Sequence, residues 1–150
     1  MREAIALSLE NVRTCQGGPF AALVVREEIV IAREVNRVTS LNDPTAHAEV
    51  LAIRAACQTL RCFHLTDCEL YTTCEPCPMC LGAIYWARIS RFFYGNTRSD
   101  ATTIGFDDSL IYDEIGKPPA KRSVSSAQLL AGEAAVAFAE WMRTSSKARY

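Results

Sequence analysis

The chain has 150 residues, 49% of them hydrophobic and 22% charged, which predicts one soluble globular domain with a single core. Its 16 basic and 17 acidic side chains nearly balance, which argues against an extensive phosphate-binding surface, because such surfaces usually carry a basic excess. No apolar run is long enough to span a membrane, and the N-terminus lacks the pattern of an export signal. Seven cysteines, an odd number, then favour reduced thiols in a cytoplasmic protein over a disulfide framework.

The first half of the chain predicts two helices separated by a β-hairpin. Residues 3–14 place apolar side chains at helical spacing before a Gly-Gly-Pro break. The apolar stripe of this helix consists of Ile5, Leu9 and Val12. The β-branched runs at 21–25 and 29–32 are joined by a short polar segment and predict a hairpin. A polar loop over 36–45 then leads into a helix predicted from 47 to about 60.

The second half predicts a strand–helix–strand unit followed by a hinge and a final helix. Strands are expected at 68–72 and 91–95, with a helix at 77–87 between them. This order implies parallel pairing through a right-handed crossover, so we expect a mixed sheet covered by helices on both faces. Prolines make 116–123 a hinge in which helix is disfavoured, and 124–150 is expected to be a C-terminal helix and tail with an apolar stripe. That stripe consists of Leu130, Ala134, Phe138 and Trp141.

Two short motifs, His47-Ala48-Glu49 and Pro76-Cys77-Pro78-Met79-Cys80, carry the chemistry. Cys77 and Cys80 are three apart, so in the first turn of a helix their sulfurs face the same side, and the helix N-terminus stabilises thiolate. One imidazole and two thiolates suit zinc and leave a fourth position for water. Glu49 is then expected to carry protons and not to bind the metal. This arrangement matches the general zinc deaminase signature.

Two other interpretations use the same cysteines. Cys74, with His47, Cys77 and Cys80, would make a closed structural zinc site, and a Cys-x-x-Cys pair is also typical of redox proteins. The combination of His-x-Glu, Pro-Cys-x-x-Cys and a gap of about 30 residues holding one strand favours the catalytic interpretation. The remaining cysteines, Cys57 among them, are interpreted as small core residues.

These motifs resemble those of the cytidine deaminase superfamily, in the branch with guanine deaminases and tRNA adenosine deaminases. The broad resemblance covers residues 17–95, and the stretches 42–49, 82–88 and 105–109, with Tyr150, resemble bacterial guanine deaminases. The resemblance implies a three-layer α/β/α fold with a mixed five-stranded sheet and one zinc ion per chain. It also implies a homodimer whose C-terminal segment crosses to the partner and covers its active site. A C-terminal helix packed on its own subunit is the alternative.

The activity implied by the resemblance is hydrolysis of guanine to xanthine and ammonia. Glu49 would take a proton from water and pass it to ring nitrogen N3, and a second acid would protonate the leaving amino group. Asp108 is the first candidate for that acid, and Glu140 on the C-terminal helix is the second.

Three further residues are candidates for binding the base. Phe20 is expected to stack on the purine, Asn42 to read its edge through the side-chain amide, and Tyr150 to cover the pocket. Core packing and turn stabilisation are the corresponding structural explanations for Phe20 and Asn42.

Two competing functions fit the same zinc motif. A tRNA adenosine deaminase would need a basic surface, but the longest basic run is Lys121-Arg122, and Asp107-Asp108 would repel phosphate. A non-catalytic module would hold a structural zinc with Cys74 as the fourth ligand. We therefore expect a nucleobase as the substrate, a second copy of the chain as the partner, and neither nucleic acid nor membrane.

Overall fold

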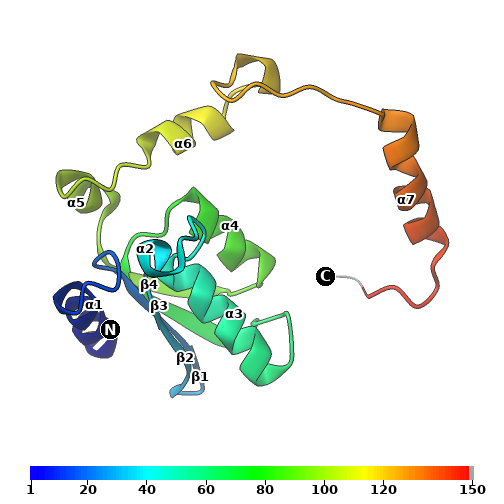
Figure 1. Cartoon of the computed structure of the whole chain (residues 1–150). Coiled ribbons are helices and arrows are strands. Elements are labelled where there is room, and N and C mark those ends of the chain that lie inside the picture. Colours follow the sequence, from blue (N-terminus) through cyan, green and yellow to red (C-terminus); the bar gives the residue numbers. More distant parts are fainter. Residues whose placement is uncertain (149–150) are drawn as a thin grey trace. The chain divides into compact units, whose positions relative to one another are not determined.

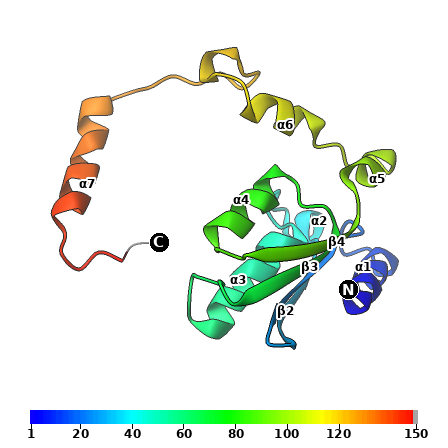
Figure 2. The same ribbon diagram turned by 180° about the vertical axis from the view of Figure 1, so that it is seen from behind.

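The helices and strands follow the hydrophobic pattern of the sequence along most of the chain. A computed structural model describes residues 1–148, and residues 149 and 150 lie outside the described part (Figures 1 and 2). The elements are α1 (Arg2–Arg13), β1 (Ala21–Arg26), β2 (Ile29–Val35), α2 (Val38–Leu41), α3 (Ala48–Leu60), β3 (Cys68–Cys74), α4 (Pro78–Trp86), β4 (Arg91–Asn96), α5 (Arg98–Thr103), α6 (Ser109–Ile115), the 3₁₀ turn η1 (Pro119–Lys121) and α7 (Ala131–Arg143). They form two compact units, Met1–Asp108 and Ser109–Tyr150.

The sheet of the first unit has the strand order β2-β1-β3-β4. β1 pairs antiparallel with β2 and β3, and β3 pairs parallel with β4 across α4, so the predicted parallel pairing and mixed sheet are confirmed. The expectation of five strands is wrong for the described residues, where the sheet has four. The sequence contains four strand-like runs, and after β4 the described chain continues as helices and irregular segments.

Helix α1 forms where it was predicted, and its most buried residues are not those of its apolar stripe. Ile5, Leu9 and Val12 are about half exposed, while Ala4 and Asn11 are buried. Asn11 is buried because its side-chain amide bonds two backbone carbonyls. A polar residue with satisfied hydrogen bonds thus faces the sheet, and the apolar stripe faces outward.

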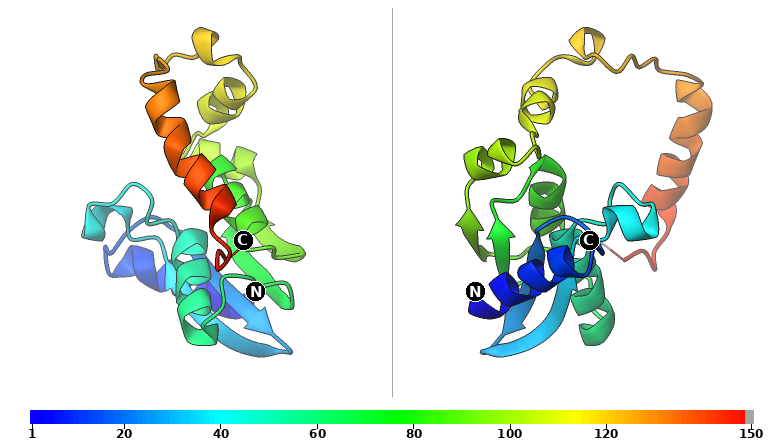
Figure 3. Two further views of the ribbon diagram at one scale, coloured as in Figure 1. Left: turned by 90° about the vertical axis from the view of Figure 1, so that its right-hand side faces the viewer. Right: turned by 60° about the vertical axis from the view of Figure 1, so that its left-hand side comes forward.

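Helices α3 and α4 lie on the sheet face opposite α1 (Figure 3). α3 packs across β1 and β2, and α4 packs beside α3. The core between these helices and the sheet is built from small and branched apolar side chains. Its buried members include Val24, Ile53, Leu65, Leu70 and Ile84. This packing brings the first turns of α3 and α4 to one end of the sheet, where β3 also ends.

The second unit contains the helices α6 and α7 and the turn η1, and its apolar side chains are exposed to solvent. α7 begins at Ala131, later than the segment predicted from residue 124, and Leu130 before it takes a left-handed conformation. Phe138 and Trp141 of the predicted stripe are exposed, and no residue of α6, η1 or α7 is buried. A 3₁₀ turn begins at Pro119 inside the predicted hinge, because the first position of a helical turn tolerates proline.

None of the helices described for residues 1–148 is long and apolar enough to cross a membrane.

Candidate active site

A tight turn delivers His47 to the start of α3. The Asp43 carboxylate accepts hydrogen bonds from the Thr45 amide at 2.8 Å and the Thr45 hydroxyl at 2.7 Å. These bonds, the hydroxyl first, hold the pKa of Asp43 below its usual value. His47 follows as the N-cap of α3 with extended backbone. Its side chain therefore projects beyond the helix end.

The two cysteines belong to the first turn of α4. Cys77 is the N-cap, with extended backbone, and Pro78 occupies the start of the helix. Proline is favoured there because it lacks the amide hydrogen that this position cannot pair within the helix. Cys80 then lies three residues on, on the same side as Cys77, and is fully buried.

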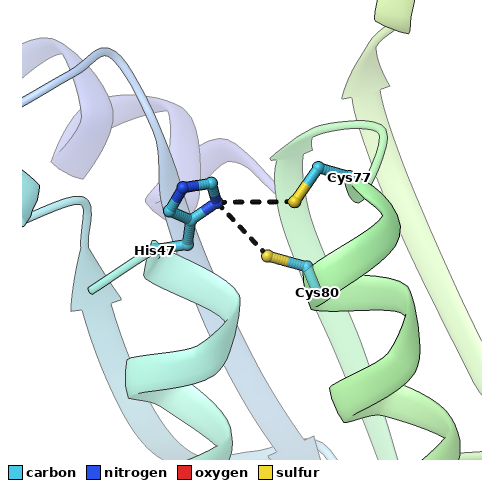
Figure 4. Close-up of side chains that lie close together, drawn as sticks. All are labelled: His47, Cys77 and Cys80. Atoms are coloured by element: carbon cyan, nitrogen blue, oxygen red, sulfur yellow. Dashed lines mark hydrogen bonds between the residues drawn. The ribbon is translucent and has the colours of Figure 1, made fainter. Parts of the chain in front are cut away.

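The imidazole and the two thiols meet in one cluster (Figure 4). The Nδ1 atom of His47 lies 3.6 Å from the Cys77 sulfur and 3.5 Å from the Cys80 sulfur. All three ligand atoms lie within 4.8 Å of one another, and this is the one group among the described residues that could hold a metal ion. The structure thus brings His47, Cys77 and Cys80 together from two helices.

The geometry of this cluster fits zinc. Tetrahedral zinc with bonds of about 2.1 Å to nitrogen and about 2.3 Å to sulfur separates the two donor atoms by about 3.6 Å. The two measured nitrogen–sulfur distances agree with that value. Three protein donors leave one tetrahedral position for water or substrate, which is the pattern of catalytic zinc sites.

The cluster also favours negative charge on sulfur. The hydrogen bond from Cys80, and then the bond to His47, lower the pKa of the Cys77 thiol to about 4. The bond to Cys77 raises the pKa of His47 and, together with burial, that of Cys80. One thiolate is therefore present at neutral pH without a cation, and a bound cation would displace the Cys80 proton.

Glu49 lies beside the cluster, almost completely buried. Its Oε1 atom accepts a hydrogen bond from the Thr72 hydroxyl at 3.1 Å, and its Oε2 atom accepts one from the Cys80 thiol at 3.4 Å. Burial raises the pKa of this carboxyl group above its ordinary value. A carboxyl group that is fixed in place and retains a proton more readily can act as a general acid or base. Sequence reasoning missed Thr72, although the period of two in β3 puts it on the face of Leu70 and Cys74.

Cys74 is separate from the ligand cluster. Its thiol donates to the backbone carbonyl of Thr97 at 3.7 Å, and burial is the main cause that raises its pKa to about 11. A protonated thiol with its own acceptor is a poor zinc ligand. The geometry therefore does not favour the closed structural site.

Asp108 ends the first unit with a side chain that is only 17% exposed. Its Oδ1 atom is buried without a hydrogen-bond partner among the described residues, and the Arg98 Nε atom lies 3.9 Å away, beyond hydrogen-bond reach. Burial raises the pKa of Asp108, Arg98 opposes the rise, and the nearby Cys77 charge adds to it. Asp108 is thus electrostatically coupled to the ligand cluster.

Phe20 and Asn42 lie on two loops of the first unit. Phe20 is half-buried, and its ring meets that of Phe106 edge to face, with centroids 4.8 Å apart. Asn42 is exposed and ends α2 in a left-handed conformation, with φ of 51°. The observed backbone accounts for an asparagine here, since asparagine tolerates this conformation better than most residues.

Glu140 and Tyr150 belong to the second unit. Glu140 is exposed on α7 and pairs with Arg143 at 3.6 Å, within one helical turn. Tyr150 lies outside the described residues. The structure therefore leaves their predicted roles as predictions.

A buried pair of asparagines, Asn11 and Asn36, joins the loop after α1 to the loop after β2, and sequence reasoning missed it. Asn11 donates through Nδ2 to the carbonyls of Gly18 at 2.8 Å and Asn36 at 2.9 Å. The Asn36 side-chain oxygen accepts from the amides of Gly18 at 3.2 Å and Val38 at 3.3 Å. A Cβ atom at Gly17 would lie 2.1 Å from the Asn36 carbonyl oxygen, so only glycine fits there. The position of Asn11 within an amphipathic helix was the one sequence feature that could have indicated this pair.

Comparison with known proteins gives concordant matches. Residues 1–96 match the family described as the cytidine and deoxycytidylate deaminase zinc-binding region. The chain is 49% identical over 150 residues to the guanine deaminase of Bacillus subtilis, covering 100% of this chain and 96% of that protein. The tRNA-specific adenosine deaminase of Agrobacterium fabrum is 51% identical over 77 residues, 51% of each chain.

Solved structures show the same pattern. The X-ray structure of guanine deaminase from Bacillus subtilis matches with a TM-score of 0.96, covering 99% of this chain and 95% of that one. A crystal structure of a mutant of the protein NE0047, in complex with 8-azaguanine, matches with a TM-score of 0.67 at 33% identity, covering 79% and 64% of the two chains.

Substitution of single cysteines tests the ligand set. Cys77→Ser and Cys80→Ser should reduce the zinc content from one ion per chain toward zero, because each removes a sulfur donor. Cys74→Ser is the matched control and should retain zinc. Metal analysis gives the zinc content of each variant. X-ray absorption at the zinc edge of the unsubstituted protein should show two sulfur and two lighter neighbours around the zinc. Three sulfur neighbours, or loss of zinc from Cys74→Ser, would establish the closed site instead.

Proposed function

The chain belongs to the cytidine and deoxycytidylate deaminase family, and from this premise we propose that it hydrolyses guanine to xanthine and ammonia. The observation that supports guanine most is the extent of the similarity. The match to a guanine deaminase runs over the whole chain, whereas the match to the Agrobacterium tRNA-specific deaminase covers about half of it. Catalytic machinery can be shared across such a family, so the remaining half bears on the choice of substrate.

Zinc is the cofactor that this donor set fits, with His47, Cys77 and Cys80 as its ligands. When bound there, it would act as a Lewis acid and lower the pKa of a water molecule from about 15.7 toward about 7. Near neutral pH that water could then give up a proton and attack guanine C2.

Glu49 would move the proton. Thr72 holds Oε1, so Oε2 is the oxygen that faces the ligand cluster, and it would become available once a bound cation had displaced the Cys80 proton. Oε2 would accept the proton of the attacking water and deliver it to N3 of the ring. The carboxyl retains this proton between the two transfers more readily because burial raises its pKa.

The leaving amino group requires a second proton donor. Asp108 suits this role because its buried Oδ1 has no hydrogen-bond partner in the described structure, and its raised pKa favours the protonated form. Glu140 is the alternative and would act only if the C-terminal segment reached the site, which the proposed exchange of segments would allow.

The base would be held by one stacking surface and a few polar groups. Phe20 would supply the surface, with its ring fixed by Phe106. Asn42 would contact the purine edge, and Tyr150 would cover the pocket. A covered pocket would leave no room for a sugar or phosphate and would restrict the substrate to the free base.

A homodimer with exchanged C-terminal segments would complete this site. The first unit leaves Tyr85 and Trp86 of α4 largely exposed, and α7 leaves Phe138 and Met142 exposed. A segment of about 40 residues rarely builds its own core, so the second unit needs an external apolar surface. Exchange of identical segments supplies such a surface at low cost.

The expected cytoplasmic location also stays a prediction.

Direct assay tests the substrate. The zinc-loaded protein should release ammonia from guanine and leave a guanosine-containing oligonucleotide and an adenosine-containing tRNA stem-loop unchanged. Glu49→Gln should retain zinc but lose about 10²- to 10⁴-fold in turnover, because the amide cannot carry the proton. Ammonia release and metal content are the two measurements. Deamination of the stem-loop with guanine untouched would establish a tRNA deaminase instead.

Paired substitutions identify the second acid. Asp108→Asn should lower kcat for guanine by about 100-fold or more while zinc and KM change little, because the loss falls on proton transfer to the leaving group. Glu140→Gln is the matched control and should retain kcat. If Glu140→Gln is the slow variant and Asp108→Asn is not, the assignment is reversed.

Mixed dimers test the exchange of the C-terminal segment. A chain lacking residues 146–150 should fold and bind zinc but turn over poorly, because closure of the pocket and retention of substrate are lost. Mixing it with a Glu49→Gln chain, under conditions that let dimers re-form, should restore activity. Only the mixed dimer then has one site with both an intact Glu49 and a tail supplied by the other chain.

Two observations complete the mixing experiment. Mass measurement under native conditions should show that mixed dimers have formed. If they form and activity does not return, the tail acts within its own chain or has no part in closure.

A further inference from the structure

Helix α3 ends in a motif that places two cysteines side by side. Arg61 takes a left-handed conformation with φ of 50°, and its amide bonds the Gln58 carbonyl at 3.3 Å. The Cys62 amide reaches back to the Cys57 carbonyl at 3.1 Å. This pair of bonds is the Schellman motif, which is frequently accompanied by a contact between the side chains of its two outermost residues. Here those residues are Cys57 and Cys62.

The spacing of this pair suits a disulfide. Standard bond lengths and the 3.1 Å bond limit the separation of the two α-carbons to about 7 Å, close to the upper end of the disulfide range. The two thiols are close enough for the charge of Cys62 to affect the titration of Cys57. Both cysteines are free thiols in the structure.

We propose that Cys57 and Cys62 form a reactive dithiol, which a small disulfide oxidant such as oxidised glutathione converts to an intramolecular disulfide. This site lies at the C-terminal end of α3, whereas His47 and Glu49 lie at its N-terminal end. The proposal does not depend on the substrate of the enzyme. The interpretation of the remaining cysteines as core residues is wrong for Cys15 and Cys62, which are exposed, and the proposal gives Cys57 a role besides packing.

The reaction proceeds by two thiol–disulfide exchanges. Cys62 thiolate attacks one glutathione sulfur, a Cys62–glutathione bond forms, and the first glutathione thiolate leaves. Cys57 thiolate then attacks the Cys62 sulfur, the Cys57–Cys62 bond forms, and the second glutathione thiolate leaves. Two electrons pass from the protein to the oxidant, and the two thiol protons end on two molecules of reduced glutathione.

The exposure of the two thiols sets this order. Cys62 is exposed, and its sulfur is fixed by the His64 amide at 3.4 Å. Cys57 is half-buried, and burial, followed by the nearby Cys62, raises its pKa, so it reacts second, with a sulfur already held beside it. An oxidant from solution therefore meets Cys62 first.

Cys68 is a competing thiol, close enough to Cys57 to interact with it electrostatically. It is buried at the start of β3, its sulfur donates to the Asp67 carboxylate at 3.8 Å, and burial is the main cause that raises its pKa to about 11. A buried thiol that keeps its proton reacts slowly. A second metal site is not indicated either, because the possible metal-holding group among residues 1–148 is the one at His47.

Mass mapping after oxidation tests the proposal. The reduced, zinc-loaded protein is treated with oxidised glutathione, the remaining thiols are alkylated, and the chain is cut with trypsin. Cleavage after Arg54, Arg61 and Arg88 separates Cys57 from Cys62. The expected product is peptide 55–61 joined to peptide 62–88 through Cys62, with a loss of about 2 Da that dithiothreitol reverses. Cys15, exposed at the end of α1, lies alone in peptide 14–26 and should carry glutathione as the internal control.

Single serine variants separate the two steps. Cys57→Ser should leave Cys62 as a stable glutathione adduct, and Cys62→Ser should leave Cys57 largely unmodified. The proposal is overturned if wild-type Cys62 accumulates as the adduct to the same extent as in Cys57→Ser. A link from Cys57 to Cys68 would overturn it as well. The wild-type map alone decides the pairing if either variant fails to fold.

Discussion

The approach of the His47 imidazole to two sulfurs, at 3.5 and 3.6 Å, is the constraint on which the rest of the structure depends. Cys77 follows His47 by 30 residues, so the fold must return the chain to the same point. Parallel pairing of β3 and β4 requires α4 to begin where β3 ends, and α3 packs across the neighbouring strands and begins at the same edge. Open α/β sheets commonly bind ligands at this end of their parallel strands. The sheet thus serves to align two helix N-termini.

Burial of Glu49 next to a thiolate carries an energetic cost. A carboxylate away from water and beside another negative charge is destabilised, and this is why its pKa rises. The Thr72 hydroxyl compensates in part by donating to Oε1. A cation at the cluster would compensate further, since it neutralises the sulfurs and attracts the carboxylate. The same placement that costs stability without metal supplies a proton carrier with metal, which is a common compromise at catalytic sites.

Sequence alone predicted the features that depend on local pattern and missed those that depend on tertiary hydrogen bonds. The four strand runs and the extents of α3 and α4 were accessible because periodicity is a local property, and the metal cluster because its two short motifs match a known deaminase signature. The fifth strand came from resemblance, and no run of residues supported it. The burial of Asn11 in α1 was not predicted, because it depends on hydrogen bonds to the carbonyls of Gly18 and Asn36. Similarly, Asn36 stabilises the loop at Gly18 by accepting its amide hydrogen, and no sequence pattern links these two residues.

The division of the chain into two units bears on how one chemistry can serve different substrates. The zinc-binding region ends at residue 96, so the metal ligands and Glu49 lie within the part shared across the family. Asp108 lies beyond it, at the end of the first unit, and the exposed apolar helix α7 lies further on. If the C-terminal segment closes the site as proposed above, it would cover a small base but obstruct a polynucleotide. Exclusion of nucleic acid would then follow from the packing of the second unit's apolar side chains, and no separate recognition element would be required.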